Sequence, residues 1–363
     1  MNLGKEVNQR RRSLGLPLLN DTFEKETRPV PRAEFLQRLK TNVKTPQDEG
    51  ISNLGKPEWL KIRPPTNQYT ELKQRLRHIG LVTVCQESHC PNMSECWSGG
   101  TATFMVLGDT CTRACKFCAV KSSGTPLPPD THEPQKLVQA VGEMKLEYVV
   151  ITAVDRDDLP DGGAAHFAAC VRALKQAYPT LIIEILSGDF QGNERDVATV
   201  VNAGVDVFAH NLETIQRLQA TVRDRRANYE QTLAVLRAAK RINPRIKTKT
   251  SIMTGLGETH EEVLQAMDDA RASGVDIITF GQYLRPSTWH LPVQEYTTPA
   301  QFAQYERDAR SKGFLYCAAG PFVRSSYRAA ELFTKGLIEQ ERVGTGKPNA
   351  QPTHTYGIAE VSQ

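Results

Sequence analysis

Short apolar segments alternate with amphipathic helical segments six times between residues 101 and 313. This alternation constrains the fold more than any other feature. Continuous apolar strands are typical of a parallel sheet covered on both faces, and parallel strands need right-handed helical crossovers. The predicted strands are 101–107, 147–154, 181–186, 206–213, 247–255 and 275–284, and the predicted helices are 133–145, 163–178, 193–204, 225–243, 259–274 and 298–313.

Six such units are compatible with a doubly wound sheet or with a partial barrel. The loop after the first strand distinguishes them, because a dinucleotide-binding sheet carries G-x-G-x-x-G there. Here that loop reads GDTCTRACKFC, residues 108–118, and no phosphate-binding motif of the Walker type occurs elsewhere. We therefore predict an α/β fold, a partial (β/α)6 TIM-like barrel, with the chemistry at the carboxyl ends of its strands.

The regions that flank the predicted barrel differ from it in composition. They are rich in proline and in small or charged residues, which favours extended and partly disordered chain. We expect N-terminal and C-terminal extensions that cover the barrel mouth. The predicted parts are a polar arm (1–65), a cysteine-containing segment (66–100), the barrel (101–315), a C-terminal segment (316–340) and a disordered tail (341–363).

Composition and charge restrict the classes of function. Of the 363 residues, 24% are charged and the net charge is +4, which is too mild to indicate nucleic-acid binding but could attract an acidic protein. No apolar run approaches the roughly 20 residues that span a membrane. The start MNLGKEVNQRRRSLGLPLL lacks the apolar stretch of a secretory signal, and early acidic residues disfavour a transit peptide. We expect a cytoplasmic protein.

Six of the eight cysteines lie between residues 85 and 118. A chain of this length does not need disulfides to fold, so clustered cysteines indicate metal. Cys111, Cys115 and Cys118 have spacings of three and two residues, with no nearby histidine, unlike the paired knuckles of zinc sites. Three thiolates on a [4Fe–4S] cluster would leave one iron open to a small chelating molecule.

The C-x3-C-x2-C spacing after the first strand, with Phe117 before the last cysteine, resembles the radical S-adenosylmethionine superfamily. The resemblance implies that the open iron is chelated by the amino and carboxylate groups of S-adenosylmethionine. One electron from the cluster then gives methionine and a 5′-deoxyadenosyl radical. A zinc site or a packed trio of thiols is the alternative from the residues alone.

Cys85, Cys90 and Cys96 form a second trio just upstream, with spacings of four and five residues. The two trios together resemble the lipoyl synthase family, and the resemblance extends from about residue 50 to residue 340. The motifs that carry it are VDRDDLPDGGA (154–164), HNLET (210–214), IMTGLGET (252–259), QYLRPS (282–287) and GPFVRSSYRA (320–329).

This family resemblance implies a second, auxiliary [4Fe–4S] cluster held by Cys85, Cys90 and Cys96. Its fourth ligand is a serine of the RSSY motif, matched to Ser326, with Ser325 as the alternative. An alkoxide is a harder ligand than a thiolate and a weaker partner for a soft cluster, so it could leave. From the residues alone, these serines would be read as a helix N-cap.

The family also implies the reaction. Two sulfur atoms are inserted at C6 and C8 of a protein-bound N6-octanoyl-lysine, two S-adenosylmethionine molecules are used, and the auxiliary cluster is consumed as sulfur donor. An unactivated C–H bond has no acidic proton, which excludes polar catalysis. The alternatives are another two-cluster radical enzyme of the biotin synthase kind, and a non-catalytic zinc or iron–sulfur module.

The implied partners follow from this reaction. They are octanoylated lipoyl carrier domains of the E2 component of 2-oxoacid dehydrogenases and of the glycine cleavage H protein. An electron donor such as flavodoxin or ferredoxin and an iron–sulfur carrier protein complete the set. Neither nucleic acid nor a membrane is expected.

Asn211 and Glu213, in HNLET, follow the fourth predicted strand and are expected near the barrel mouth. They could bind the ribose or the methionyl amino group of S-adenosylmethionine, and a helix cap is an equal alternative. Arg285 is a candidate contact for cluster or cofactor, or an ordinary ion pair. An acidic loop could recognise a basic protein surface or could simply be solvated; its residues are Asp155, Asp157, Asp158 and Asp161. We expect Cys170 and Cys317 to be small core residues and not metal ligands.

Overall fold

The computed structural model describes residues 57–60, 82–83, 103–325 and 336–338. An eight-stranded sheet in the order β1-β2-β5-β6-β7-β8-β9-β10 forms its body, with β1 antiparallel to β2 and every later neighbour parallel. The strands are β1 (Val82–Thr83), β2 (Thr103–Val106), β5 (Tyr148–Ala153), β6 (Ile182–Leu186), β7 (Val207–Ala209), β8 (Lys247–Thr254), β9 (Ile277–Gln282) and β10 (Tyr316–Gly320).

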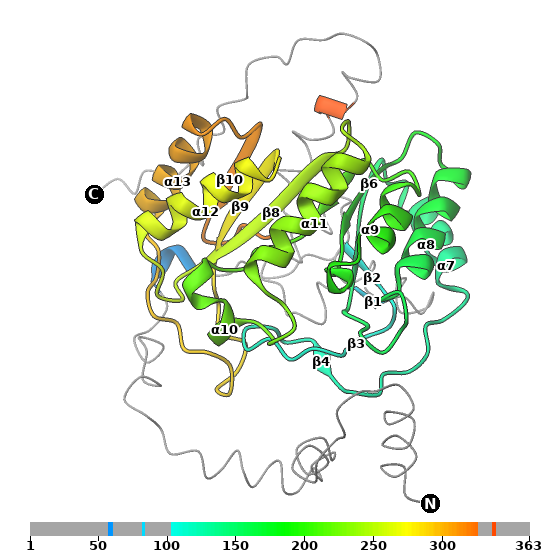
Figure 1. The fold of residues 1–363 in the computed structure, drawn as a ribbon, viewed down its shortest axis with the longest axis horizontal. Helices are drawn as coiled ribbons and strands as arrows, with labels where there is room; N and C mark the ends of the chain where they lie inside the picture. Colours follow the sequence, from blue (N-terminus) through cyan, green and yellow to red (C-terminus); the bar gives the residue numbers. More distant parts are fainter. Residues whose placement is uncertain (1–56, 61–81, 84–102, 326–335, 339–363) are drawn as a thin grey trace, which may run out of the picture. The chain divides into compact units, whose positions relative to one another are not determined.

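Six longer helices connect the parallel strands, and Figure 1 shows them in chain order along one face of the sheet. They are α7 (Glu133–Met144), α8 (Ala164–Ala177), α9 (Glu194–Val201), α11 (Tyr229–Ile242), α12 (His260–Ala272) and α13 (Pro299–Ser311). The shorter elements are η3 (Glu58–Leu60), η4 (Phe190–Gly192), η5 (Gln216–Leu218), α10 (Gln219–Val222) and the parallel pair β3 (Thr110–Cys111) and β4 (Lys121–Ser122).

Both faces of the sheet are buried, which explains the continuous apolar strands. Successive side chains of a strand point to opposite faces. In β5, Val149 and Ile151 belong to the main core under the helices, whereas Tyr148 and Val150 pack with Ile338 in a second core on the other face. The strands therefore cannot show the apolar–polar alternation of a half-exposed sheet.

Local sequence signals position the helices on this sheet. Helix α12 begins with a capping box, in which the Thr259 side chain accepts from the Glu262 amide and the Glu262 carboxylate accepts from the Thr259 amide. Helix α13 begins after Thr298, whose hydroxyl accepts from the Gln301 amide, and has Pro299 in its first turn. These caps agree with the predicted helix starts at residues 259 and 298.

The predicted partial barrel is confirmed, and all six predicted strands and helices are present. Two differences have physical reasons. Strand 206–213 is shorter than predicted: β7 ends at Ala209, and beyond it only His210 and an isolated bridge at Glu213 continue the backbone pairing with β8. A seventh parallel strand, β10, was not predicted, because its sequence YCAAG is short and lacks β-branched residues.

The predicted extensions over the barrel mouth lie mostly outside the described residues, and the five-part division of the chain stays a prediction. The structure adds that β10, at the start of the 316–340 segment, belongs to the central sheet. None of the described helices combines the length and the apolar character that crossing a membrane requires.

Candidate active site

The three downstream cysteines lie on the loop that follows β2, which we call the thiol loop (residues 108–120). The chain turns sharply into it, since Leu107 and Gly108 have φ values of 69° and 91°. The loop is anchored through its backbone: the Thr112 amide donates to the Asp155 carbonyl at 2.9 Å, and the Ser123 amide donates to the Cys111 carbonyl at 2.9 Å. Parallel strands present their carboxyl ends at one edge, so the loop lies at the predicted catalytic edge.

The three thiols of this loop are partly buried. Burial raises the pKa of Cys111 and of Cys115 to about 12, and that of Cys118 to about 11. A thiolate is the form that binds metal. Loading of the loop with metal must therefore release protons, and the negative charge of the thiolates is stable there only when a metal compensates it.

The three sulfur atoms of the loop are not gathered at one point in this structure. Zinc–sulfur bonds of about 2.3 Å would bring tetrahedrally arranged sulfur atoms to within roughly 4 Å of one another. Within the described residues, the one set of three ligand atoms all closer than 4.8 Å belongs to other residues. The loop as it stands therefore does not hold its three thiols at the spacing of a zinc site.

Arg113, between Cys111 and Cys115, fastens the thiol loop to the barrel. Its side chain is 2% exposed. It donates two hydrogen bonds to Asp189 after β6, at 2.6 and 2.7 Å, and two to Asp157 after β5, at 2.9 and 2.8 Å. Charge-assisted bidentate pairs are among the strongest hydrogen bonds, so this contact fixes the loop on two strands.

The acidic loop after β5 has an internal role that neither sequence interpretation included, although Asp158 is also exposed, as the solvated-loop alternative expected. Asp157 pairs with Arg113, and Asp158 pairs with the buried Arg156. Asp161 accepts from the amides of Gly163 and Ala165, at the start of α8. These carboxylates hold arginines and a helix start of the same chain, which their sequence pattern did not reveal.

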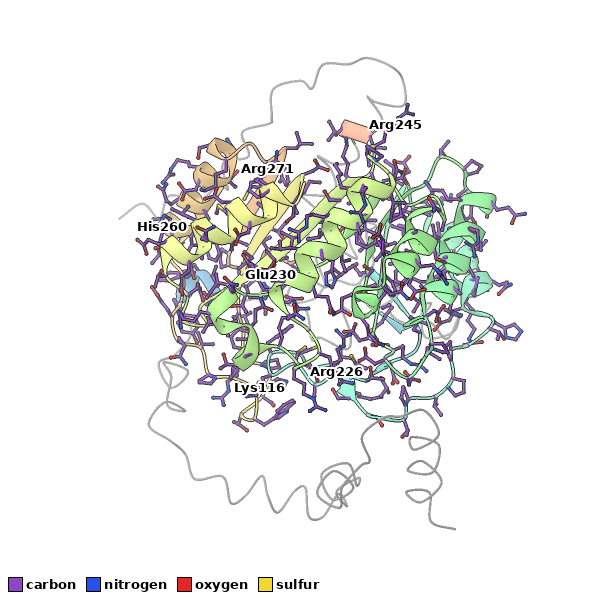
Figure 2. The ribbon with its side chains drawn as sticks, in the orientation of Figure 1. Lys116, Arg226, Glu230, Arg245, His260 and Arg271 are labelled. Atoms are coloured by element: carbon purple, nitrogen blue, oxygen red, sulfur yellow. The ribbon has the colours of Figure 1, made fainter. Side chains whose placement is uncertain are left out.

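The chain between α10 and α11 holds the opposite side of the thiol loop. The Asp224 carboxylate accepts from the Ala114 amide at 2.9 Å, and the Asp224 amide donates to the Cys115 sulfur at 3.3 Å. Arg226 donates to the Thr112 carbonyl at 2.7 Å and forms an ion pair with Asp224. Figure 2 shows Lys116 and Arg226 at the same edge of the molecule.

Asn211 and Glu213 lie together after β7, as the sequence predicted. The Asn211 amide nitrogen donates to Glu213 Oε1 at 3.0 Å. Burial raises the pKa of Glu213, and the nearby Arg223 opposes that rise. The other polar atom of the Asn211 amide, Oδ1, is buried and has no hydrogen-bond partner among the described residues. A buried acceptor without a partner is costly, so this position fits a ligand that donates a hydrogen bond.

Arg223 is a site residue that sequence reasoning missed. It is buried, and its charge lowers the pKa of both Cys115 and Glu213, which places it between the thiol loop and Glu213. Its Nη1 donates to the Thr232 hydroxyl at 2.9 Å, while its Nε is buried without a partner in the described structure. Nothing in the local sequence TVRDRR distinguishes this arginine from its exposed neighbours.

The group of Asn211, Glu213 and Arg223 has the donor and acceptor pattern that an amino acid requires. A carboxylate and an amide oxygen can accept from an ammonium group, and a guanidinium can donate to a carboxylate. The methionyl part of S-adenosylmethionine carries both groups. These residues therefore fit the cofactor that the superfamily implies.

The glycine-rich segment after β8 packs tightly against the barrel edge. Gly255 has φ 90°, and a Cβ there would meet Gln282 Nε2 and the Glu295 carbonyl oxygen at 2.2 and 2.3 Å. The Glu258 carboxylate accepts from the amides of Gly255 and Leu256. Glycine is required at position 255 by both conformation and space.

Arg285 binds carbonyl groups of its own loop. Its guanidinium donates to the carbonyls of Ser287, Thr288 and His290, and so it shapes the loop after β9. That loop reaches the thiol loop through His290, whose Nε2 lies 3.0 Å from the Cys118 carbonyl oxygen. Among the described residues Arg285 forms these hydrogen bonds and no ion pair, and its role as a cluster or cofactor contact stays a prediction.

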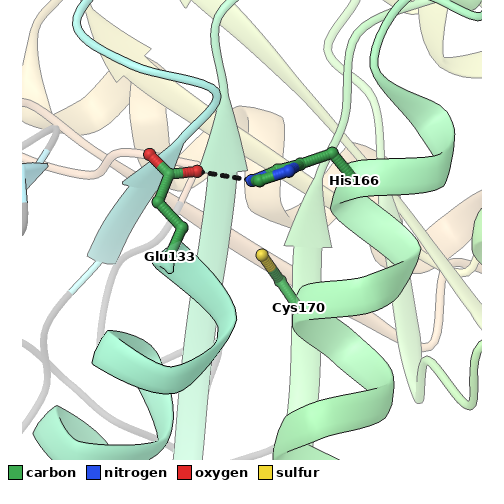
Figure 3. Close-up of side chains that lie close together, drawn as sticks. All are labelled: Glu133, His166 and Cys170. Atoms are coloured by element: carbon green, nitrogen blue, oxygen red, sulfur yellow. Dashed lines mark hydrogen bonds and ion pairs between the residues drawn. The ribbon is translucent and has the colours of Figure 1, made fainter. Parts of the chain in front are cut away.

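Glu133, His166 and Cys170 form the compact set of ligand atoms mentioned above (Figure 3). The Glu133 carboxylate oxygen Oε2 already accepts from the Leu107 amide at 2.9 Å and lies 2.7 Å from His166 Nε2. Glu133 thereby supplies a hydrogen-bond acceptor for the backbone amide of Leu107, where the chain turns into the thiol loop. Cys170 and Cys317 are both buried in the main core, as predicted.

Cys85, Cys90, Cys96 and Ser326 lie outside the described residues, and their roles stay predictions. Ser325, the alternative serine, is partly buried at the end of the described chain after β10.

Comparison with known proteins supports one family. A family model for the radical SAM superfamily matches residues 105–270. The apicoplast lipoyl synthase of Plasmodium vivax (strain Salvador I) is 56% identical over 79% of this chain and 65% of that protein. A lipoyl synthase of Anaeromyxobacter sp. (strain Fw109-5) is 55% identical over 80% of this chain and 98% of that protein. The chloroplastic lipoyl synthase 1 of Populus trichocarpa is 55% identical over 79% of this chain and 78% of that protein.

The matched part of the chain thus spans slightly less than two thirds of the Plasmodium vivax protein and nearly all of the Anaeromyxobacter protein. Among solved structures, HydG, a maturase of the [FeFe]-hydrogenase, has a TM-score of 0.49 and 12% identity, over 75% of this chain and 60% of that one. That likeness is too distant to add to the assignment. The sequence matches alone decide it: the chain belongs to the lipoyl synthase family of the radical SAM superfamily.

Proposed function

We propose that the protein is a lipoyl synthase that inserts two sulfur atoms, at C6 and C8, into the octanoyl chain of a protein-bound N6-octanoyl-lysine. Two S-adenosylmethionine molecules are consumed for each lipoyl group. The observation that carries this proposal is the thiol loop: three partly buried thiols in the C-x3-C-x2-C spacing lie beside a group of residues with unpaired polar atoms suited to an amino acid.

When bound, the iron–sulfur clusters and S-adenosylmethionine supply a carbon radical able to remove hydrogen from an unactivated C–H bond, together with the sulfur that replaces it. Cys111, Cys115 and Cys118 are the proposed ligands of the first cluster. Arg113 holds their loop rigid through Asp157 and Asp189.

The proposed binding of S-adenosylmethionine uses the unpaired atoms of the site. Glu213 and Asn211 Oδ1 accept hydrogen bonds from the ammonium group, and Arg223 Nε donates to the carboxylate. Asn211 and Arg223 are buried and Glu213 is partly buried, which limits the access of water, strengthens these contacts and protects a radical from side reactions. Glu213 is held in a rarely populated backbone conformation, which supports a positional role.

The second cluster is proposed to bind Cys85, Cys90, Cys96 and the serine oxygen of Ser326. Octanoylated carrier domains, of the E2 and H-protein kind, are the proposed substrates. A flavodoxin or ferredoxin is the proposed reductant, and an iron–sulfur carrier protein restores the consumed cluster. A cytoplasmic location also stays a prediction, because the relatives include apicoplast and chloroplast proteins.

The first test is a count of iron and sulfide in anaerobically reconstituted protein. The unchanged sequence should hold close to eight irons, and the triple variant Cys85→Ala, Cys90→Ala, Cys96→Ala should hold about four. That variant should still cleave S-adenosylmethionine but form no lipoyl group on an octanoylated carrier domain. Four irons or mainly zinc in the unchanged protein would overturn the proposal, as would sulfur insertion into desthiobiotin instead of the carrier.

A further inference from the structure

We propose that the outer side of the thiol loop is the docking surface for an acidic one-electron carrier protein. We call it the loop surface, and Lys116, Arg225 and Trp289 define it. The inference rests on the proposed function, which needs electrons delivered singly from outside the chain. It adds where the reductant binds and which side chains recognise it.

Two cations of the loop surface are available to a partner. Lys116 lies between Cys115 and Cys118, and Arg225 lies in the segment that holds the other side of the thiol loop; both side chains are exposed. In the described structure neither side chain has a hydrogen bond or an ion pair, whereas the adjacent Arg226 pairs with Asp157 and Asp224. Unpaired cations at one edge favour an acidic partner.

These residues lie close together through backbone contacts. The Lys116 amide donates to the Val222 carbonyl at 2.9 Å, and the Leu291 amide donates to the Lys116 carbonyl at 3.2 Å. The segments around Arg225 and Trp289 therefore both border Lys116.

Trp289 supplies an apolar contact on the same surface. Its side chain is 59% exposed, although tryptophan is usually buried. The ring packs on His290 with centroids 4.0 Å apart, and Arg285 fixes the surrounding loop through three carbonyls. An exposed tryptophan two residues before Leu291, whose amide binds the Lys116 carbonyl, has the composition of an interface hot spot.

The position favours an electron carrier over the acylated carrier domain. Trp289 is followed by His290, which contacts the carbonyl of the proposed ligand residue Cys118, so a protein docked here would lie next to the loop that would hold the cluster. Electron transfer slows steeply with distance, which rewards such proximity. An acyl chain must instead reach the proposed cofactor group, where Asn211 is buried and Glu213 is partly buried.

The test compares two reductants on the reconstituted full-length protein. Reduced flavodoxin is an acidic protein that must dock, whereas dithionite is a small ion that need not. The variants are Lys116→Gln, Arg225→Glu and Trp289→Ala. The matched control is Arg245→Glu, because Arg245 is an exposed cation just before β8 at the opposite edge of the molecule (Figure 2).

We expect each loop-surface variant to weaken the binding of oxidised flavodoxin, measured by isothermal titration, by about tenfold, with the largest loss for Arg225→Glu. The salt dependence of binding should decrease in both charge variants. In Arg225→Glu and Trp289→Ala, S-adenosylmethionine cleavage with flavodoxin should require correspondingly more flavodoxin, while cleavage with dithionite should stay within twofold. Arg245→Glu should leave all of these quantities unchanged.

Other outcomes would overturn the docking proposal. Unchanged flavodoxin binding in all three variants would place the reductant elsewhere. Weaker binding of the octanoylated carrier domain, with flavodoxin binding unaffected, would assign the loop surface to the substrate protein. An equal loss with both reductants would show an effect on the cluster itself. Failure of the unchanged protein to cleave S-adenosylmethionine with dithionite would instead refute the proposed function.

Discussion

Arg113 and Asp189 form a bidentate ion pair, with nitrogen–oxygen distances of 2.6 and 2.7 Å, in which neither side chain is more than 2% exposed. The pair connects the thiol loop after β2 with the end of β6, although the two residues are 76 positions apart in the chain. The cysteine spacing is local, but this contact gives the loop a defined position on the barrel.

Removing this arginine should strongly destabilise the fold. Arg113→Ala leaves the buried carboxylate of Asp189 unpaired, and such a loss costs about 3–5 kcal/mol. Chemical denaturation of the metal-free protein would measure it. The control is Arg217→Ala, which breaks the more exposed Arg217–Glu262 pair and should cost less than about 1 kcal/mol. Equal losses in the two variants would contradict the role of Arg113.

His210 should make stability depend on pH. It is buried with Arg223, Asp189 and Arg113 around it, and burial lowers its pKa from 6.5 to about 4. Between these values the unfolded chain binds a proton that the folded chain does not, so stability falls as pH falls. From pH 7 to pH 5 the loss should be about 2 kcal/mol.

The measurement is the free energy of unfolding at both pH values, for the unchanged protein and for His210→Gln. Glutamine retains a donor for the Ser187 carbonyl, which lies 2.8 Å from His210 Nδ1, but does not titrate. The pH-dependent difference between the two proteins should be close to the expected loss. Parallel pH profiles would show that another group controls the dependence.

Glu213→Gln should weaken S-adenosylmethionine binding without changing the metal content. A hydrogen bond to a charged group contributes about 1.5–3 kcal/mol, which corresponds to a roughly 10- to 100-fold higher Kd. Equilibrium binding to the reconstituted protein, with iron counted in parallel, would measure both quantities. Glu230→Gln, on the exposed face of α11, is the control (Figure 2). An unchanged Kd in Glu213→Gln would remove this residue from the site.

Gly255→Ala should destabilise the barrel edge by more than the conformational cost of a positive φ. The control is Gly313→Ala, because Gly313 also has a positive φ, 81°, but a Cβ there would meet nothing within 4 Å. The difference between the two variants isolates the overlap with Gln282 and Glu295, which we expect to cost roughly 1–3 kcal/mol. Equal unfolding free energies would show that the segment relaxes freely.

The sequence by itself determined the architecture and the class of chemistry. Apolar strands and amphipathic helices are local patterns, and capping residues such as Thr259 and Thr298 mark helix starts without reference to distant residues. Cysteine spacing is local too, because ligands a few residues apart on one loop can share a cluster in any context. The motif HNLET directly follows a predicted strand, so its place at the edge of the sheet could also be predicted from the sequence.

Only the tertiary structure decided which charged residues serve the site. Arg113, Asp157 and Asp189 come from three separate loops, and Arg223 looks like its exposed neighbours in the sequence. Their roles depend on the parallel sheet, which brings the ends of distant strands to one edge and removes their side chains from water. At that edge Arg113 and Arg223 are buried and bonded to other side chains, whereas Lys116 and Arg225 are exposed. No local sequence pattern encodes this difference.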